Sequence, residues 1–289
     1  MGPNRIVAVI RPLAVALALL LPGAPTALAG GASALPATLS GAAFEMWHLH
    51  SPYAEGAVTD DLKILNQLTV GADQTQGNNK QLDLQGTERI FLGKGAFFNM
   101  TTAAGAYSES GNVVTPTAVV ARNYLVDNAS EYHFDKTFFV YLDLQWYANT
   151  FVGVNDATGA EAGAGVFLID TPDRVVRTHV GYSYEKRNLN PIIVEAETTL
   201  TDETIDAVVA GGRYFQAINA ASYLLLDALY FHDTADGQNY RASGSVSLTF
   251  ALTTTLALTT QAQVNYDNVP VAGYEKTDTS LATSLTITF

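Results

Sequence analysis

The stretch Thr277-Asp278-Thr279-Ser280-Leu281-Ala282-Thr283-Ser284-Leu285-Thr286-Ile287-Thr288-Phe289 alternates between two kinds of side chain up to its last residue. Leu281, Leu285, Ile287 and Phe289 fall on one face, and small, mostly polar residues fall on the other. Successive side chains of a β-strand point to opposite faces, so this period of two predicts a strand. One face of that strand is apolar and ends in an aromatic ring.

The first residues have the three parts of a secretory leader. Arg5 and Arg11 precede the apolar run 13–21, and the small-residue sequence Ala27-Leu28-Ala29 follows it. The run is far shorter than the roughly 20 residues that a membrane-spanning helix needs. We therefore predict a signal peptide over residues 1–29.

The rest of the chain divides into a short lead-in and one strand-rich domain. Residues 30–61 are rich in Ala, Gly and Pro and have no sustained period, so we predict a flexible periplasmic lead-in. Residues 62–289 are predicted to form twelve strands, near 66–75, 80–91, 95–107, 115–134, 137–151, 156–169, 174–187, 203–216, 221–232, 239–251, 254–267 and 276–289. An even number lets the first strand pair antiparallel with the last. Short connections are predicted around 92–94, 135–136, 170–173, 219–220 and 252–253, alternating with mostly longer loops such as 188–202.

The predicted strands have an apolar and a polar face. In 240–252, for example, Leu248 and Phe250 oppose Ser247 and Thr249. Aromatic residues on the apolar faces gather near the strand ends: Phe138, Phe250 and Phe289 at one end, and Trp146, Tyr184, Tyr230, Tyr240 and Tyr266 at the other. Two aromatic belts around an aliphatic band are typical of a membrane barrel whose apolar face contacts lipid. The sequence thus predicts an all-β fold, an antiparallel transmembrane β-barrel in the outer membrane of a Gram-negative bacterium.

Composition limits the partners and the chemistry. Removing Arg5 and Arg11 with the leader changes the formal net charge from −13 to −15, which argues against nucleic acid as a partner. Cysteine is absent, which excludes disulfides and thiol chemistry. The expected partners are outer-membrane lipid, lipopolysaccharide and the barrel assembly machinery, for which Phe289 is the predicted assembly signal. Small cations are further expected partners, and no cofactor or metal is predicted.

Two segments resemble the YdiY-like family of salt-induced outer-membrane proteins. Leu168-Ile169-Asp170-Thr171-Pro172-Asp173-Arg174, between Gly163-x-Gly165 and Gly181-x-x-Tyr184-Glu185, is similar to the central turn of that family. The carboxyl-terminal segment 268–289 is similar to its last loop and strand, although Val and Ala replace family prolines there. The resemblance implies a barrel, an outer-membrane location and a link to osmotic or salt stress. It supplies no catalytic residues.

The strongest candidate site is the lumen. The strand phases direct a set of charged and polar residues inward: Asp143, Glu161, Arg177, His179, Glu185, Arg241, Asn265 and Asp278. An excess of carboxylates in a narrow, water-filled lumen favours cations. Alternatively, these groups pair across strands and fill the interior. Arg241, Asn265 and Asp278 are expected to lie roughly abreast, as a pore constriction or as a structural ladder.

The favoured function is therefore a non-enzymatic envelope barrel, either structural or a narrow, cation-preferring channel. One alternative is an adhesin-like barrel that binds through its outer loops, and a less favoured one is a lipid-modifying enzyme. His179 and Ser183 share a face but are four residues apart, about 13 Å along a strand, which is too far for a catalytic dyad. His48 and His50 point the same way in an extended segment, yet two imidazoles without a third ligand are weak evidence for a metal site.

Overall fold

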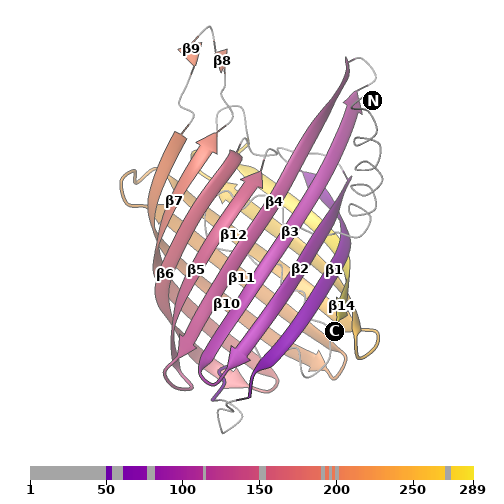
Figure 1. Cartoon of the computed structure of the whole chain (residues 1–289), viewed down its shortest axis with the longest axis vertical. Helices are drawn as coiled ribbons and strands as arrows, with labels where there is room; N and C mark the ends of the chain where they lie inside the picture. The colour runs from indigo at the N-terminus through magenta and orange to yellow at the C-terminus, as the bar shows by residue number, and fades with distance from the viewer. Residues whose placement is uncertain are drawn as a thin grey trace, which may run out of the picture.

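The computed structural model describes residues 50–53, 61–76, 82–112, 115–149, 154–189, 193–194, 197–198, 202–270 and 275–289. Twelve strands form a closed antiparallel barrel in the order β1-β14-β13-β12-β11-β10-β7-β6-β5-β4-β3-β2 (Figure 1). Their bounds are β1 Lys63–Gln76, β2 Leu82–Lys94, β3 Phe97–Asn112, β4 Thr115–His133, β5 Phe138–Asn149, β6 Val154–Thr171, β7 Arg174–Leu189, β10 Asp202–Asn219, β11 Ser222–Asp233, β12 Tyr240–Ala251, β13 Leu256–Asp267 and β14 Thr277–Thr288. The predicted fold class and all twelve predicted strands are confirmed.

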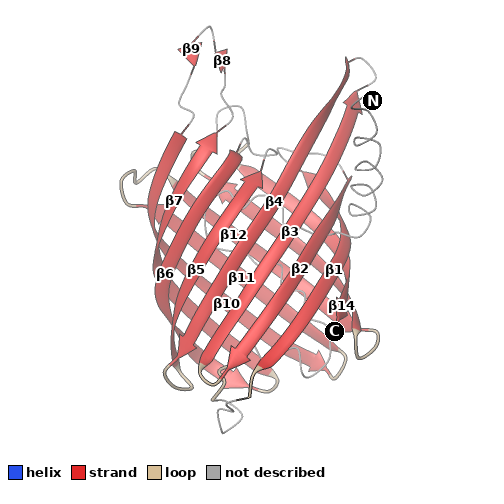
Figure 2. Cartoon of the chain, viewed as in Figure 1, coloured by secondary structure: helices blue, strands red, loops and turns tan. Residues whose placement is uncertain are grey.

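The regular elements of the described residues are all strands (Figure 2). Among them no helix is long and apolar enough to cross a bilayer. Two further strands, β8 (Ile193–Val194) and β9 (Glu197–Thr198), form a separate two-stranded sheet in the segment between β7 and β10. Figure 1 shows this small sheet beyond the barrel rim, in a region that the sequence predicts as a long loop.

The barrel closes between its first and last strands. β1 pairs with β14 from Gln67, opposite Thr288, to Gln76, opposite Thr279. Beyond this register Asn66 and Phe289 exchange both backbone hydrogen bonds, at 3.1 and 3.0 Å. Phe289 therefore belongs to the closing seam. Its ring is 69% exposed on the outer surface.

Side chains follow the predicted inside-out arrangement. Phe250 and Ile287 are 44% and 42% exposed, whereas their strand neighbours Thr249 and Thr286 are completely buried in the lumen. Some inward hydroxyl groups pair across strands, as in the Thr249–Thr259 hydrogen bond of 2.8 Å. Leu248, Leu256, Leu258 and Leu285 also lie on the outer face. A soluble barrel would reverse this distribution.

Both predicted aromatic belts are present. Phe138 and Phe250 lie on the outer face at the end of the barrel that carries the connections 95–96, 134–137, 172–173, 220–221 and 252–255, which we call the short-turn end. The other end is the long-loop end. There Tyr230, Tyr240 and Tyr266 form a row across β11, β12 and β13, with successive ring centroids 6.3 and 5.9 Å apart.

The outer face of β3 and β4 departs from the aliphatic pattern. Asn99 donates to Asn128 Oδ1 at 3.0 Å and to Ser130 Oγ at 2.8 Å, and Asn128 donates to Thr101 Oγ1 at 2.8 Å. A polar group in hydrocarbon is costly when it lacks a hydrogen-bond partner. Because these amides bond to each other, the cost of placing them in the lipid-facing band is reduced.

The β2–β3 and β12–β13 turns differ from the predicted ones. The β2–β3 connection lies at Gly95-Ala96 rather than at 92–94, because Gly95 has φ of 60°, a left-handed conformation that glycine adopts easily. The β12–β13 connection covers 252–255, two residues more than predicted. In this longer turn the hydroxyl of Thr253 accepts the backbone amides of Thr255 and Leu256. The longer turn changes the register of β12 against β13.

Candidate functional site: the barrel lumen

The eight predicted lumen residues lie on the inner face of the barrel. Asp143, Glu161, Arg177, Glu185 and Arg241 are at most 9% exposed. His179, Asn265 and Asp278 are partly buried on the same inner face. They do not converge on one point, however. The structure divides them into an acidic group in the middle, an aromatic and basic group at the short-turn end, and ion pairs toward the long-loop end.

The middle group consists of three carboxylates on adjacent strands. Asp143 of β5 is directly opposite Glu161 of β6, and Asp127 of β4 lies within electrostatic range of both. Tyr141 donates its hydroxyl to Glu161 Oε1 at 2.5 Å. Like charges directly opposite one another destabilise a strand pair. Strand pairing alone thus does not account for three acidic side chains at this level of the lumen.

A basic side chain, Arg89, approaches this group. It projects from β2, is 2% exposed, and interacts electrostatically with Asp127 and with Arg213. Arg213 belongs to β10, which is six positions from β2 in the barrel order in either direction. Side chains from opposite walls therefore approach each other in the interior. Side chains fill much of the lumen at this level, as in other small barrels.

Arg213 is itself paired on its own wall. Its Nε donates to Asp227 Oδ1 at 2.6 Å, across the β10–β11 register. Asp127 and Arg213 were both missed as site residues from the sequence. Both residues occupy inward-facing positions of the predicted strands, and this was the signal that could have identified them.

Aromatic rings fill the short-turn end of the lumen. Phe139, Phe167 and Phe215 form a buried cluster with Val175, Tyr223 and Leu225. Arg177 extends over the Phe139 ring, with Cζ 4.3 Å from its centroid, a cation–π contact. The same guanidinium bonds Glu131 Oε1 at 2.5 Å.

His133 completes this group. Its Nε2 is 3.2 Å from Glu131 Oε2, and its ring stacks on Phe139 at 5.5 Å. Arg177 was predicted as a lumen residue, whereas Glu131 and His133 were not. The positive charge of Arg177 is therefore neutralised by Glu131 and lies among aromatic rings.

Glycines of β6 and β7 make room for the rings of β5. A Cβ on Gly165 would lie 2.1 Å from Phe139 Cζ, and a Cβ on Gly181 would lie 2.2 Å from Tyr141 Oη. The ring of Tyr141 also meets His179 edge-on, with centroids 5.2 Å apart. These close approaches require residues without a Cβ. They give the Gly163-x-Gly165 and Gly181 motifs a packing role inside the lumen.

Toward the long-loop end, Glu185 is held by residues that sequence reasoning did not identify. Arg187 Nε donates to Glu185 Oε1, and Tyr147 donates its hydroxyl to the same oxygen at 2.7 Å. Arg187 Nη1 also lies 3.5 Å from Glu203 Oε2. This arrangement is a buried ion-pair network.

The predicted row of Arg241, Asn265 and Asp278 is only partly present. Asn265 is directly opposite Asp278, as expected, but Arg241 is opposite Asp267, and Ser243 takes the place beside Asn265. The four-residue turn at 252–255 is the cause. It changes the register, so each residue of β13 is opposite a residue of β12 that lies closer to the turn than in the predicted hairpin. Arg241 also lies over Phe231, with Cζ 5.3 Å from the ring centroid.

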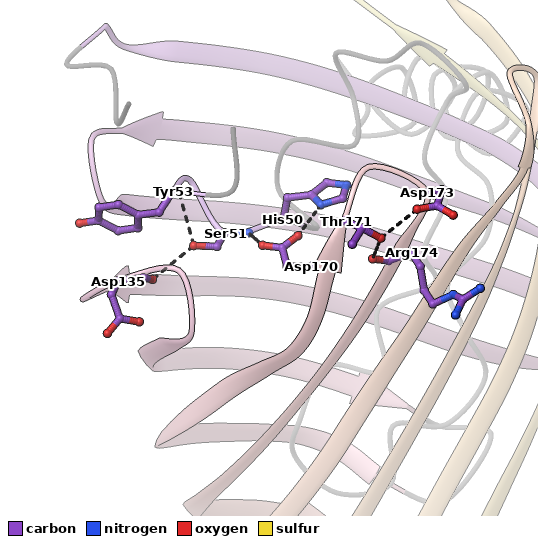
Figure 3. A network of polar contacts seen from close by, with 8 residues as sticks. All are labelled: His50, Ser51, Tyr53, Asp135, Asp170, Thr171, Asp173 and Arg174. Atoms are coloured by element: carbon purple, nitrogen blue, oxygen red, sulfur yellow. Dashed lines mark hydrogen bonds and ion pairs between the residues drawn. The ribbon is translucent and has the colours of Figure 1, made fainter. Parts of the chain in front are cut away.

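A short piece of the lead-in lies at the short-turn end (Figure 3). His50 Nδ1 is 2.6 Å from Asp170 Oδ1, and the backbone amide of Ser51 donates to Asp170 Oδ2 at 2.9 Å. Ser51 Oγ donates to the carbonyl oxygen of Asp135, and Tyr53 donates its hydroxyl to that of His133, both at 3.3 Å. The remainder of 1–60, including the predicted signal peptide and His48, lies outside the described residues.

Asp135, whose carbonyl oxygen accepts the Ser51 hydroxyl, also stabilises its own turn. The backbone amides of Thr137 and Phe138 donate to Asp135 Oδ1 at 2.6 and 2.9 Å. These bonds stabilise the carboxylate and lower the pKa of Asp135 below its usual range.

Two chemical possibilities can be examined in the described part of the chain. No group of three or more His, Asp or Glu side chains there is arranged to hold a metal ion. Ser183 Oγ lacks a hydrogen-bond partner among these residues, and Ser183 pairs with Glu161 and Ala207 rather than with a histidine. His179 is opposite Gly165 and Gly211. The register therefore keeps His179 and Ser183 apart, as predicted.

Comparison with known proteins agrees with this architecture. The solved structure of the NanC porin is similar at a TM-score of 0.51 and 9% identity, over 76% of this chain and 98% of that one. A KdgM porin in complex with disordered oligogalacturonate aligns at a TM-score of 0.44 and 9% identity, over 77% and 99% of the two chains. The translocator domain of the autotransporter NalP from Neisseria meningitidis aligns at 0.45 and 13%, over 84% and 93%. At 9% identity the likeness to the NanC porin concerns the fold alone.

No curated protein matches the chain in sequence. A family model does match, and it covers residues 68–289, from within β1 through the last residue after β14. This span includes every lumen side chain discussed above and the closing seam at Phe289. The chain belongs to the family described as "Protein of unknown function, DUF481".

Proposed function

We propose that the protein is a non-enzymatic outer-membrane barrel whose lumen, when open, passes small cations. The short-turn end faces the periplasm and the long-loop end faces outside, as the even strand number and the loop lengths suggest. The observation that carries the proposal is the acidic group of Asp127, Asp143 and Glu161 in the middle of a lumen surrounded by a lipid-facing apolar wall.

The sign of the preference follows from how the inward charges pair. Arg177 bonds Glu131, Arg187 bonds Glu185, and Arg213 bonds Asp227. These pairs contribute little net charge. The acidic group brings Asp127, Asp143 and Glu161 together, and the guanidinium of Arg89 interacts with Asp127, so we infer an excess of acidic groups at this level of the lumen. A confined negative potential raises the local concentration of cations.

The lumen in this structure supports a small or closed pathway rather than a wide pore. Rings occupy the short-turn end, and Arg89 approaches the opposite wall in the middle. We therefore expect conductance far below that of a wide general porin. The resemblance to the YdiY-like family adds an osmotic or salt-stress role to the proposal, which the abundance of the protein at raised salt would test.

Planar-bilayer recording under a KCl gradient tests the charge argument. We expect a reversal potential that indicates cation preference, and a weaker preference when Asp143→Asn is combined with Glu161→Gln. A matched control removes two exposed carboxylates instead, with Asp156→Asn and Asp236→Asn. Anion preference in the native protein, or an equal loss in the control, would refute the role of the acidic group. Complete silence of every form would leave a structural barrel.

A further inference from the structure

We propose that the short-turn end of the barrel is a binding site for the chain's own segment 50–53, which seats there as a plug. Asp170, at the end of β6, is the residue that holds it. This site accepts a short peptide through one carboxylate, two backbone carbonyl groups and an aromatic wall. The seating of the segment does not depend on conduction. The closure of a channel by this segment rests on the proposed function.

The carboxylate of Asp170 contacts two successive residues of the segment. Oδ1 is 2.6 Å from His50 Nδ1, and Oδ2 accepts the Ser51 amide at 2.9 Å. The two side chains of the His50–Asp170 pair are only 14% and 9% exposed. Hydrogen bonds to an ionised group are stronger than neutral ones, and shielding from water strengthens them further.

A β-bulge is what turns Asp170 toward the segment. The β6–β7 register shifts between Phe167 and Ile169, and after the shift Asp170 is opposite Val175. Val175 is completely buried on the inner face. The bulge thus changes which residues of β6 point inward, as bulges do when they redirect a side chain. Without it, Asp170 would continue the outward phase of Leu168.

A second turn completes the site. The carbonyl oxygens of His133 and Asp135, where β4 leads into β5, accept Tyr53 Oη and Ser51 Oγ. Figure 3 shows Ser51 between the Asp135 turn and Asp170. The segment therefore bridges two neighbouring connections of the barrel. Ser51 is 2% exposed, which is the burial of a core residue rather than of a surface loop.

The segment also reaches the interior. The His50 ring meets Phe215 of β10 edge-on, with centroids 6.3 Å apart. Phe215 is completely buried and belongs to the aromatic cluster with Phe139 and Phe167. His50 thus contacts Asp170 at the end of β6 and Phe215 of β10. These two contacts place it at the mouth of the lumen. A seated segment extends the aromatic filling of this end.

Thiol labelling tests whether the segment is seated. The chain has no cysteine, so Ser51→Cys introduces a single thiol at a buried position while keeping the backbone amide that bonds Asp170. In folded full-length protein we expect slow reaction with a maleimide. Adding Asp170→Ala should accelerate labelling by about tenfold or more, the scale of one charge-assisted hydrogen bond. The matched control is Asp173→Ala, because Asp173 is exposed in the same connection and its carboxylate accepts the Thr171 hydroxyl rather than a group of the segment.

Each outcome is decisive. Fast labelling of Ser51→Cys alone overturns the seated segment, and slow labelling that Asp170→Ala leaves unchanged overturns the role of Asp170. Heat-modifiable migration checks that every variant is folded. If Asp170→Ala fails to fold, His50→Ala takes its place, since it breaks the same contact from the segment side. In bilayers, Asp170→Ala should increase open time. Faster labelling without any conductance keeps the binding site and rejects the channel instead.

Discussion

Replacing Gly165 by alanine should destabilise the barrel, and replacing Gly244 should not. Both glycines lie inside strands, but a Cβ on Gly165 would be 2.1 Å from Phe139 Cζ and 2.7 Å from the carbonyl oxygen of Thr178. At Gly244 the nearest atoms are 3.9 Å away, which is ordinary van der Waals contact. The same chemical change therefore meets a filled space at Gly165 and ordinary van der Waals contact at Gly244.

The magnitude follows from what Phe139 contacts. Its ring is 1% exposed, stacks on His133 and lies under Arg177 at 4.3 Å, so it cannot rotate away without breaking these contacts. Overpacking a core costs about 1–3 kcal/mol, and we expect the upper part of that range because the Thr178 carbonyl is backbone. Gly244→Ala should be neutral or stabilising by about 0.5–1 kcal/mol, since glycine is unfavourable within a strand.

Equilibrium unfolding by urea in lipid vesicles, followed by tryptophan fluorescence, measures both free energies. Equal slopes against urea would show that the same surface is exposed in all variants. The packing argument fails if Gly165→Ala stays within about 0.5 kcal/mol of the native protein, or if Gly244→Ala loses as much as Gly165→Ala.

Three further outcomes are expected. Leu258→Arg on the lipid-facing surface should lower the free energy of unfolding in vesicles by about 2–4 kcal/mol, whereas an unchanged value would contradict the inside-out assignment. Deleting Phe289 removes both backbone bonds to Asn66 at the closing seam, so the amount of heat-modifiable protein in the membrane fraction should fall, and unchanged abundance would oppose this. Glu131→Gln should destabilise the barrel by about 3–5 kcal/mol in the same unfolding assay, because it leaves the Arg177 guanidinium buried without its carboxylate partner. A neutral effect would reject this pairing.

The fold could be predicted because the barrel has a period of two along nearly every strand. Leu285 and Thr286, for example, differ in hydropathy and are 40% and 0% exposed. One residue of register error would exchange these environments, so the alternation alone specifies which face meets lipid. The position of the β2–β3 turn could not be predicted in this way, because Gly93 and Gly95 are equally good turn residues in sequence. Only the backbone conformation distinguishes them.

The inward direction of the lumen residues could also be predicted, but their partners could not. Asp127 and Glu131 share the phase of the predicted inward side chains, so the pattern was sufficient to identify them. The approach of Arg89 to Arg213 is different, because it depends on the diameter of the closed barrel and on side chains from opposite walls. No spacing within one hairpin contains that information. Ion pairs such as Arg187 with Glu203 likewise depend on the register between β7 and β10.

The seat of residues 50–53 depends on two features that a periodic pattern cannot reveal. The segment is too short to show a period, and Asp170 faces inward only because of the bulge at Phe167–Ile169. The consequence for function is a separation along the barrel axis. In the proposed channel the acidic group that would select charge lies in the middle, whereas the segment contacts the short-turn end, so we expect a change at Asp170 to alter access without altering the acids. The two proposals thus assign selectivity and closure to different residues, and each can be perturbed while the other is measured.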